Sequence, residues 1–223
     1  MIFYSVHFNR PEFIEIQKKC IDEIGGILVV VNNSRDSRIS SECEKLGVRC
    51  YPIPVIEDSD PSRSHGSALN FITEIIDYSQ DWCTLDHDFF PLKEIGFKDY
   101  DILGLVHGDE KVGNYLWPGF MAGKKSIPLS GINFSPSPGK DTWSGTSVLL
   151  NRGYKVKEVT EERIGFKDNE FPLQKQSGLI KFENFGIHYL NGSEWMSVDP
   201  QIREEKINLL LETISQMLSK NKK

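Results

Sequence analysis

Short apolar runs alternate with longer amphipathic segments through the first part of the chain. The runs have the length of buried strands, and they predict strands at residues 2–6, 27–31, 48–53 and 82–85. The segments between them carry apolar residues at helical spacing and predict helices at residues 11–24, 37–46 and 67–78. Alternation of this kind builds a parallel sheet with right-handed crossovers. We therefore expect an α/β fold.

The pattern changes after residue 90. Further strands are predicted at 101–106, near Phe120, around Val156 and around Ile180, with a short helix at 143–150. Residues 107–140 are rich in Gly, Pro, Ser and Lys and predict a long loop. The clearest element is an amphipathic C-terminal helix at 200–219, whose apolar stripe consists of Ile207, Leu210, Leu211, Ile214, Met217 and Leu218. Residues 220–223 are expected to form a solvated tail.

Length and composition indicate one domain. The chain has 223 residues, and neither a linker nor a repeat divides it. We expect a single α/β domain whose central, mostly parallel sheet has about six or more strands and is flanked by helices.

Charge and apolar patterning exclude several classes of partner. The formal net charge of -6 argues against a surface built for nucleic acid. No apolar run approaches the about 20 residues of a membrane span, and the N-terminus lacks a secretory signal, so the expected location is the cytoplasm. Four cysteines form no CxxC pair and are expected to be reduced: Cys20, Cys43, Cys50 and Cys83.

The sharpest signal for chemistry is Asp86-His87-Asp88, at the end of the strand predicted at 82–85. Two carboxylates one residue apart offer the oxygen ligands that Mg²⁺ or Mn²⁺ prefers. The same aspartates would also suit a polar turn. Upstream, the small and polar residues 64–70 open the helix predicted at 67–78, and a helix start favours a phosphate group, although an ordinary helix cap explains them equally well.

The order Gly66-x-Ala68-x-Asn70, helix, strand, Leu85-Asp86-x-Asp88 resembles the GT-A fold glycosyltransferases (family 2-like, DxD-containing), which transfer sugars from nucleotide-sugar donors. Three further segments extend the resemblance over nearly residues 5–195: Asn9-Arg10-Pro11-Glu12, Val31-Asn32-Asn33-Ser34 and His188-x-x-x-Gly192-Ser193-x-Trp195. The motif order looks most like the inverting branch of the family. The resemblance implies a nucleotide-binding half at 1–90 and an acceptor and donor-sugar half at 91–199.

The resemblance also implies the site residues. Mn²⁺ or Mg²⁺ would be held by Asp86, Asp88 and His188, with Asp88 as a direct ligand. Asn32 would hydrogen-bond a base edge of the donor. Apart from the resemblance, the aromatic faces of Trp117 and Phe120 suit stacking on a sugar ring of the acceptor or the donor, with core packing as the equal alternative for both. The expected donor-binding residues are Ser5, His7, Asn9, Arg10, Asn32, His65, Gly66, Asn70, Asp86, Trp117, Gly192 and Ser193.

Inverting transfer needs one carboxylate to take a proton from the acceptor hydroxyl. Asp141 resembles the family's acidic residue on the acceptor side and is the expected base. It equally fits a helix N-cap. Asp109 and Glu110 are the reserve candidates.

The hypothesis from the sequence is a metal-dependent glycosyltransferase of the hexosyltransferase type, moving a sugar from a nucleotide-diphosphate donor, expected to be a UDP-sugar, to a glycan or glycoconjugate hydroxyl. Two alternatives stay open. A nucleotidyltransferase would share the parallel sheet and the carboxylate pair, but the Gly-rich phosphate loop typical after its first strand is missing. A non-catalytic module that binds nucleotide sugars or glycans would keep the fold without turnover.

Overall fold

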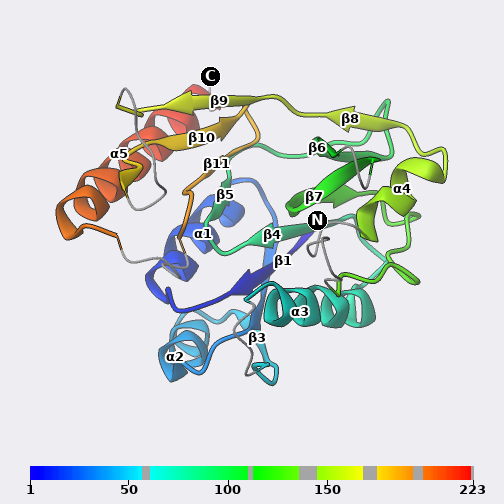
Figure 1. Cartoon of the computed structure of the whole chain (residues 1–223), viewed down its shortest axis with the longest axis horizontal. Coiled ribbons are helices and arrows are strands. Elements are labelled where there is room, and N and C mark those ends of the chain that lie inside the picture. Colours follow the sequence, from blue (N-terminus) through cyan, green and yellow to red (C-terminus); the bar gives the residue numbers. More distant parts are fainter. Residues whose placement is uncertain (57–60, 110–112, 136–144, 168–174, 193–197, 222–223) are drawn as a thin grey trace.

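A computed structural model describes residues 1–56, 61–109, 113–135, 145–167, 175–192 and 198–221 (Figure 1). The helices are α1 (Glu12–Glu23), α2 (Ser37–Lys45), α3 (Pro61–Ile75), α4 (Ser147–Asn151) and α5 (Pro200–Asn221). The strands are β1 (Ile2–His7), β2 (Ile27–Asn32), β3 (Arg49–Pro52), β4 (Trp82–Asp86), β5 (Phe89–Pro91), β6 (Ile102–Asp109), β7 (Gly113–Gly123), β8 (Val156–Glu158), β9 (Glu161–Ile164), β10 (Leu179–Phe182) and β11 (Gly186–His188). Within these ranges, no helix combines the length and the apolar character needed to cross a membrane.

Seven strands form the central sheet, in the order β3-β2-β1-β4-β7-β6-β8. β1 runs parallel to β2 and β4, β2 to β3, and β6 to β8, whereas β7 is antiparallel to both of its neighbours. The expected α/β fold with a mostly parallel central sheet is confirmed. In the register of β1, His7 lies opposite Asn32 and Val6 opposite Asp86. The strands β1, β2 and β4 therefore end at one edge of the sheet.

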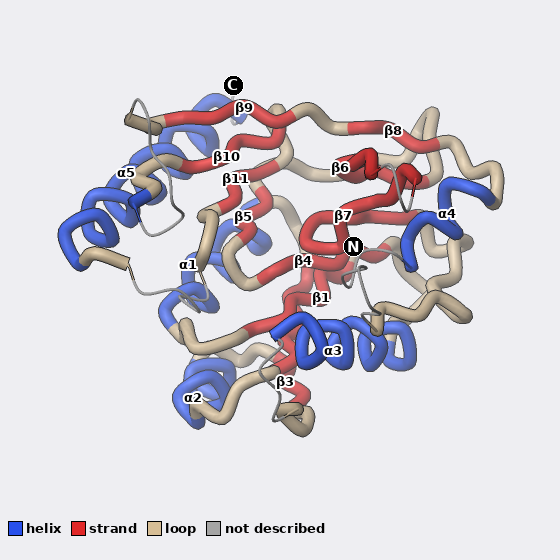
Figure 2. The backbone as a smooth tube through the Cα atoms, in the orientation of Figure 1, coloured by secondary structure: helices blue, strands red, loops and turns tan. Residues whose placement is uncertain are grey.

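Both faces of β1, β2 and β4 are buried, which explains their almost continuous apolar sequence. One face packs on α1 and α2 through Phe3, Leu28, Val30, Ile14 and Ile39. The other face packs on α3 through Tyr4, Val29, Val31, Leu69 and Ile72. Figure 2 shows β1 between α1 and α2 on one side and α3 on the other, whereas β8 and β9 run along the top edge of the view.

A second, four-stranded sheet has the order β5-β11-β10-β9 and is antiparallel throughout. Helix α5 packs on it, at the opposite side of the view from α4 (Figure 1). Of the predicted stripe of α5, Leu210, Ile214 and Met217 are buried, but Leu211 is 47% exposed. Leu211 therefore lies at the margin of the buried stripe, which faces the second sheet and α1.

Two other predicted boundaries were wrong. Helix α3 begins at Pro61, not at Ser67, since proline fits the first turn of a helix. The long loop expected from residue 107 is in part a hairpin, because β6 extends to Asp109 and β7 begins at Gly113. The Pro118 that suggested a loop is accommodated where the pairing of β7 with β6 shifts register.

Candidate active site

The Asp86-His87-Asp88 segment joins the two sheets. Asp86 ends β4 in the central sheet, His87 and Asp88 form a turn, and Phe89 begins β5 in the second sheet. The turn lies at the edge where the parallel strands β1, β2 and β4 have their carboxyl ends. This is the edge at which open α/β sheets bind ligands.

Gln17 of α1 contacts the backbone on both sides of this turn. Its fully buried amide donates to the carbonyl oxygens of Asp86 and Phe89, at 3.1 Å and 2.8 Å, while its Oε1 lies 3.0 Å from Nε2 of His7. Gln17 was not among the residues predicted from the sequence. The signal that would have found it is a polar residue on the apolar face of a helix, among Phe13, Ile14, Cys20 and Ile21.

Asp88 meets the distant segment around His188. Nε2 of His188 lies 3.4 Å from Oδ1 of Asp88, and the two side chains are only 12% and 8% exposed. The backbone N–H of Gly192 donates to Oδ2 of Asp88 at 2.9 Å. A Cβ atom at position 192 would lie 2.4 Å from Cβ of Asp88, so this close approach requires glycine.

The electrostatics of Asp88 favour its charged form. Burial by itself would raise the pKa of the carboxyl group, but the neighbouring His188 and His87 and the hydrogen bonds from His188 and Gly192 outweigh it. The pKa of Asp88 therefore lies well below its usual range. A buried carboxylate that stays ionised is well suited to hold a cation.

Asp86 turns to a different partner. Its Oδ1 lies 2.9 Å from Nε2 of His65 on α3. Gly119 lets the backbone of β7 pass close to the Asp86 carboxylate. A Cβ atom at position 119 would lie 2.5 Å from Oδ2 of Asp86 and 2.3 Å from the ring of Trp117. The Trp117 ring, half-buried, lies 4.8 Å from the ring of His188, measured between centroids. Trp117 thus flanks both carboxylate positions.

Phe120 does not line the site. It is fully buried and stacks on Phe89 with ring centroids 4.3 Å apart. Of the two aromatic alternatives in the sequence analysis, Phe120 takes the core-packing one.

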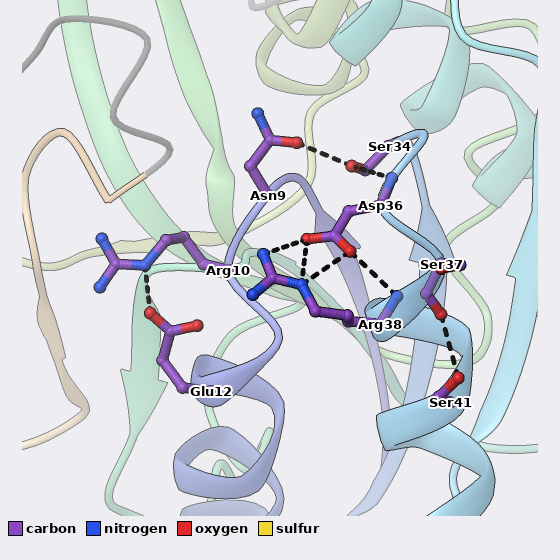
Figure 3. Close-up of polar contacts among 8 residues, drawn as sticks. All are labelled: Asn9, Arg10, Glu12, Ser34, Asp36, Ser37, Arg38 and Ser41. Carbon is purple, nitrogen blue, oxygen red and sulfur yellow. Dashed lines mark hydrogen bonds and ion pairs between the residues drawn. The ribbon is translucent and has the colours of Figure 1, made fainter.

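The loops after β1 and β2 are tied together (Figure 3). The hydroxyl of Ser34 donates to Oδ1 of Asn9 at 2.8 Å, and Asn9 adopts a left-handed φ of 56°. Asn32 is buried, its Oδ1 accepting from the Ser34 backbone N–H and its Nδ2 donating to Ser40. The amide of Asn32 is thus already engaged within the loop that the sequence analysis assigned to base recognition.

Arg10 lies between these loops and the His188 segment. Its Nε donates to Glu12, as Figure 3 shows, its guanidinium stands 4.4 Å over the ring of Phe13, and its Nη1 donates to the Gly192 carbonyl at 3.4 Å. The Arg10 side chain is only 6% exposed. It therefore places a positive charge beside the Gly192 loop.

Ser5 and His7 are buried under the site and do not line its surface. Both are fully buried, and within the described residues the Ser5 hydroxyl and Nδ1 of His7 have no hydrogen-bond partner. Burial lowers the pKa of His7 to about 3, with nearby His87 acting in the same direction. His7 is therefore neutral.

The α3 residues take a different place from the one expected. Because α3 starts at Pro61, Gly66 and His65 lie within the helix and not at a phosphate-binding start. Gly66 is buried. Asn70 faces another segment, accepting from the Phe134 backbone N–H at 2.8 Å and donating to Ser135 at 3.1 Å. That prediction of a helix start was wrong, although His65 still reaches the site through Asp86.

Asp141, Ser193 and Glu110 lie outside the described residues. Asp109 is the last residue of β6, and the structure describes its backbone only.

The three predicted metal ligands have side chains that suit a divalent cation, but only two of them lie together. Asp88 and His188 are side by side, with carboxylate oxygen and imidazole nitrogen as candidate ligands. Asp86 instead contacts His65. Across the described parts of the chain, no three His, Cys, Asp or Glu side chains converge as a metal cluster. The predicted ligand set is thus assembled for two of its three members.

No family model and no curated protein matches the chain. Among solved structures, the mannosyltransferase PcManGT from Pyrobaculum calidifontis, in complex with GDP-Man and Mn²⁺, aligns over 70% of this chain with 13% identity and a TM-score of 0.47. The alignment covers 53% of the mannosyltransferase, so this chain spans about half its length.

Two other solved structures are similar to part of the chain. The inositol-1-phosphate CTP transferase from T. maritima aligns over 70% of this chain and 84% of its own, with 11% identity and a TM-score of 0.40. The galactosyltransferase LgtC aligns over 56% of this chain and 58% of its own, with 11% identity and a TM-score of 0.38. At these TM-scores the alignments assign no activity to this chain.

Proposed function

We propose that the chain is a metal-dependent glycosyltransferase that moves a sugar from a nucleotide-diphosphate donor, expected to be a UDP-sugar, to a hydroxyl of a glycan or glycoconjugate, with inversion. The observation that carries this proposal is the contact of Asp88 with His188 and Gly192. Two motifs that resemble separate elements of the GT-A glycosyltransferase pattern meet in space, although 104 positions separate Asp88 from Gly192. If the two motifs matched the pattern only by chance, their residues would not be expected to contact each other.

The surroundings of this contact support a diphosphate there. The Arg10 guanidinium adds a positive charge beside Gly192. The nucleoside would extend from Asp86 along the strand ends toward Asn9 and Asn32, because the three strands end in register at one edge. The half-buried Trp117 offers an aromatic face for the donor sugar.

Asp88 and His188, with Asp86, would hold Mn²⁺ or Mg²⁺, which when bound neutralises the charge of the departing diphosphate. Gln17 and the N–H of Gly192 keep the Asp88 turn in one conformation before any ligand arrives. We assign proton removal from the acceptor hydroxyl to Asp141, whose carboxylate would take the proton as the oxygen attacks the anomeric carbon.

The test is a thermal-shift panel of UDP, GDP, CDP and ADP, each with and without Mn²⁺. A nucleotide that binds the native state stabilises it by RT ln(1 + [L]/Kd), so at equal concentrations the tightest-binding nucleotide raises the melting temperature most. UDP with Mn²⁺ is expected to give the largest shift, and Asp88→Asn is expected to abolish it. Asp99→Asn, at an exposed position, is the matched control and is expected to keep the full shift.

Turnover separates the alternatives. A glycosyltransferase releases UDP from a UDP-sugar when an acceptor hydroxyl, or water, is present. Release of pyrophosphate from CTP or UTP in the presence of a sugar phosphate would instead identify a nucleotidyltransferase. Metal-dependent binding with neither reaction across an acceptor panel would identify a binding module and refute the proposal.

A further inference from the structure

Lys206 is a lysine on the buried stripe of α5. It precedes Leu210, Ile214 and Met217 at helical spacing, and these three residues pack on the second sheet and α1. Lys206 is only 3% exposed. Lysine is seldom buried to this extent unless its ammonium group has a partner, so the contacts of that group indicate why a lysine stands at this position.

The Lys206 ammonium group contacts two consecutive residues that follow β11. Its Nζ donates to the Leu190 carbonyl at 2.6 Å and stands 4.2 Å from the centroid of the Tyr189 ring. A hydrogen bond from a charged donor is about twice as strong as a neutral one, and the ring face adds a cation–π attraction. The Tyr189 backbone N–H in turn donates to the Asp88 carbonyl at 2.8 Å. Lys206 is thus bound to the segment that contacts Asp88.

Leu190 lies midway between the two groups that contact the Asp88 carboxylate. His188, two residues before it, places Nε2 3.4 Å from Oδ1 of Asp88, and Gly192, two residues after it, donates its N–H to Oδ2 at 2.9 Å. Asn191, between Leu190 and Gly192, has a left-handed φ of 59°, a conformation that persists in a non-glycine residue only where the surroundings hold it. The position of the Leu190 carbonyl therefore bears on both contacts with Asp88.

Three elements far apart in the chain hold this turn, residues 188–192. Asp88 holds it from the turn after β4, and Arg10, just before α1, donates to the Gly192 carbonyl at 3.4 Å. Lys206 holds it from α5, which lies beyond residues 5–195, the part of the chain that resembles the GT-A glycosyltransferases. None of the site residues predicted from the sequence lies on α5.

We propose that Lys206 is a positioning residue of the candidate active site, which fixes the Leu190 carbonyl and thereby holds His188 and the Gly192 N–H against Asp88 for binding of a divalent cation with a nucleoside diphosphate. The identity of these ligands rests on the proposed function, whereas the effect of Lys206 on the turn does not. Without the ammonium group, the half-buried Leu190 carbonyl turns to water for its hydrogen bond. His188 and Gly192 then lose their fixed spacing, and loss of such a supporting contact lowers metal affinity about 10- to 100-fold.

The first experiment measures the Mn²⁺-dependent UDP affinity of the full chain by titration calorimetry. Lys206→Met keeps a side chain of similar length over Tyr189 but removes the donor, and we expect about 10-fold weaker binding. Lys206→Arg restores a charged N–H donor and is expected to recover most of the affinity. Lys220→Met, at an exposed position in the last turn of α5, is the matched control and is expected to bind as the wild type does.

A second control separates positioning from packing of the helix. Ile214→Val shortens a buried side chain on the same stripe, so it is expected to lower the melting temperature and to leave the nucleotide affinity unchanged. Circular dichroism verifies that each variant is folded. Unchanged affinity in Lys206→Met, or the same loss of affinity in Ile214→Val, would make Lys206 a packing residue of α5 and overturn the proposal.

A further readout needs no ligand. Hydrogen exchange of the Gly192 amide, followed by NMR, is expected to be faster in Lys206→Met than in the wild type and to return toward the wild-type rate in Lys206→Arg. Amides of β4, in the central sheet, are expected to keep their rates. A Gly192 amide that exchanges equally in all three proteins overturns the proposal. If its exchange changes as expected but the wild type binds neither nucleotide nor Mn²⁺, the proposed function fails and the positioning of the turn by Lys206 stands.

Discussion

Nε2 of His188, on β11, lies 3.4 Å from Oδ1 of Asp88, in the turn after β4. We expect His188→Gln to weaken Mn²⁺-dependent UDP binding about 10-fold or more, because loss of a direct metal ligand costs more than about 1.4 kcal/mol. Titration calorimetry with and without Mn²⁺ measures the effect. His107→Gln, a histidine stacked on Tyr115, is the control. A lowered melting temperature with intact metal-dependent affinity would make His188 a packing residue only.

Gly192→Ala introduces a methyl group where its Cβ atom would lie 2.4 Å from Cβ of Asp88. We expect a loss of about 1–3 kcal/mol in the free energy of unfolding, the range for overpacking, together with weaker nucleotide binding. Urea unfolding gives the stability change. Gly96→Ala is the matched control, since a Cβ atom there meets nothing within 4 Å. Equal effects at the two glycines would contradict the close approach at Gly192.

Gln17→Leu removes the donor that serves the Asp86 and Phe89 carbonyl oxygens. At least one buried carbonyl is then left unsatisfied, at a cost of about 1–3 kcal/mol, and the turn between the sheets loosens. The free energy of unfolding, measured in urea, and the Mn²⁺-dependent nucleotide affinity are both expected to fall. Gln216→Leu, at an exposed position of α5, is expected to change neither. Unaltered nucleotide affinity in Gln17→Leu would show that the turn holds its shape without the amide.

The acid sensitivity of folding is expected to depend on His7. Its pKa is lowered from 6.5 to about 3 by burial, so below pH 6.5 the unfolded chain takes up a proton that the folded chain rejects. Stability from this group is complete above pH 6.5 and is lost toward pH 3, at no more than about 1.4 kcal/mol per pH unit. The free energy of unfolding of His7→Gln is expected to fall less steeply over this range. Parallel pH profiles for variant and wild type would exclude His7 as the titrating group.

Asp141→Asn tests the proposed base. We expect sugar transfer to fall by about 10² to 10⁴ while UDP affinity in the presence of Mn²⁺ is kept, because the side chain is assigned to the acceptor. Steady-state rates and thermal shifts report the two quantities separately. Asp109→Asn is the comparison variant. Transfer at the wild-type rate by Asp141→Asn would move the assignment to Asp109 or Glu110, and loss of donor binding would move Asp141 to the donor side.

Much of the first half of the fold was readable from its sequence. Strands β1, β2 and β4 are buried on both faces, so their apolar runs stand out from the polar residues that end them. The start of α3 was misread because Ser64, His65 and Gly66 have the local character of a turn. Tertiary contacts stabilise them in a helix: Ser64 donates to Asn33 at 2.7 Å, and His65 contacts Asp86. Neither contact can be predicted from the residues around positions 64–66, because Asn33 and Asp86 are distant in the sequence.

The candidate site could be proposed from the sequence where residue type or a motif suggests chemistry. Asp86 and Asp88 belong to the first case, and His188 belongs to the second, through the resemblance of its segment to the family's terminal motif. Gln17 and Gly119 belong to neither, because their roles come from what lies opposite them in space, a carbonyl oxygen or a tryptophan ring. Of the second sheet only β10 was predicted, as the strand around Ile180, and the other three strands were missed. Its strands have three or four residues, too few to show a period of two.

In the proposed metal site, the turn at His87 and Asp88 makes docking of the second sheet a condition of ligand affinity. Asp88 follows the central sheet, whereas His188 ends a strand of the second sheet, which is held by α5. A cation that bridges them binds only while the two sheets are together, so by mass action it must oppose their separation. Amide hydrogen exchange in β10 and β11 is therefore expected to slow when Mn²⁺ and UDP are added. β3 lies at the far edge of the central sheet, so its exchange rate is not coupled to docking of the second sheet. If exchange slows in β10 and β11 but not in β3, the ligand opposes separation of the sheets and not only unfolding of the whole chain.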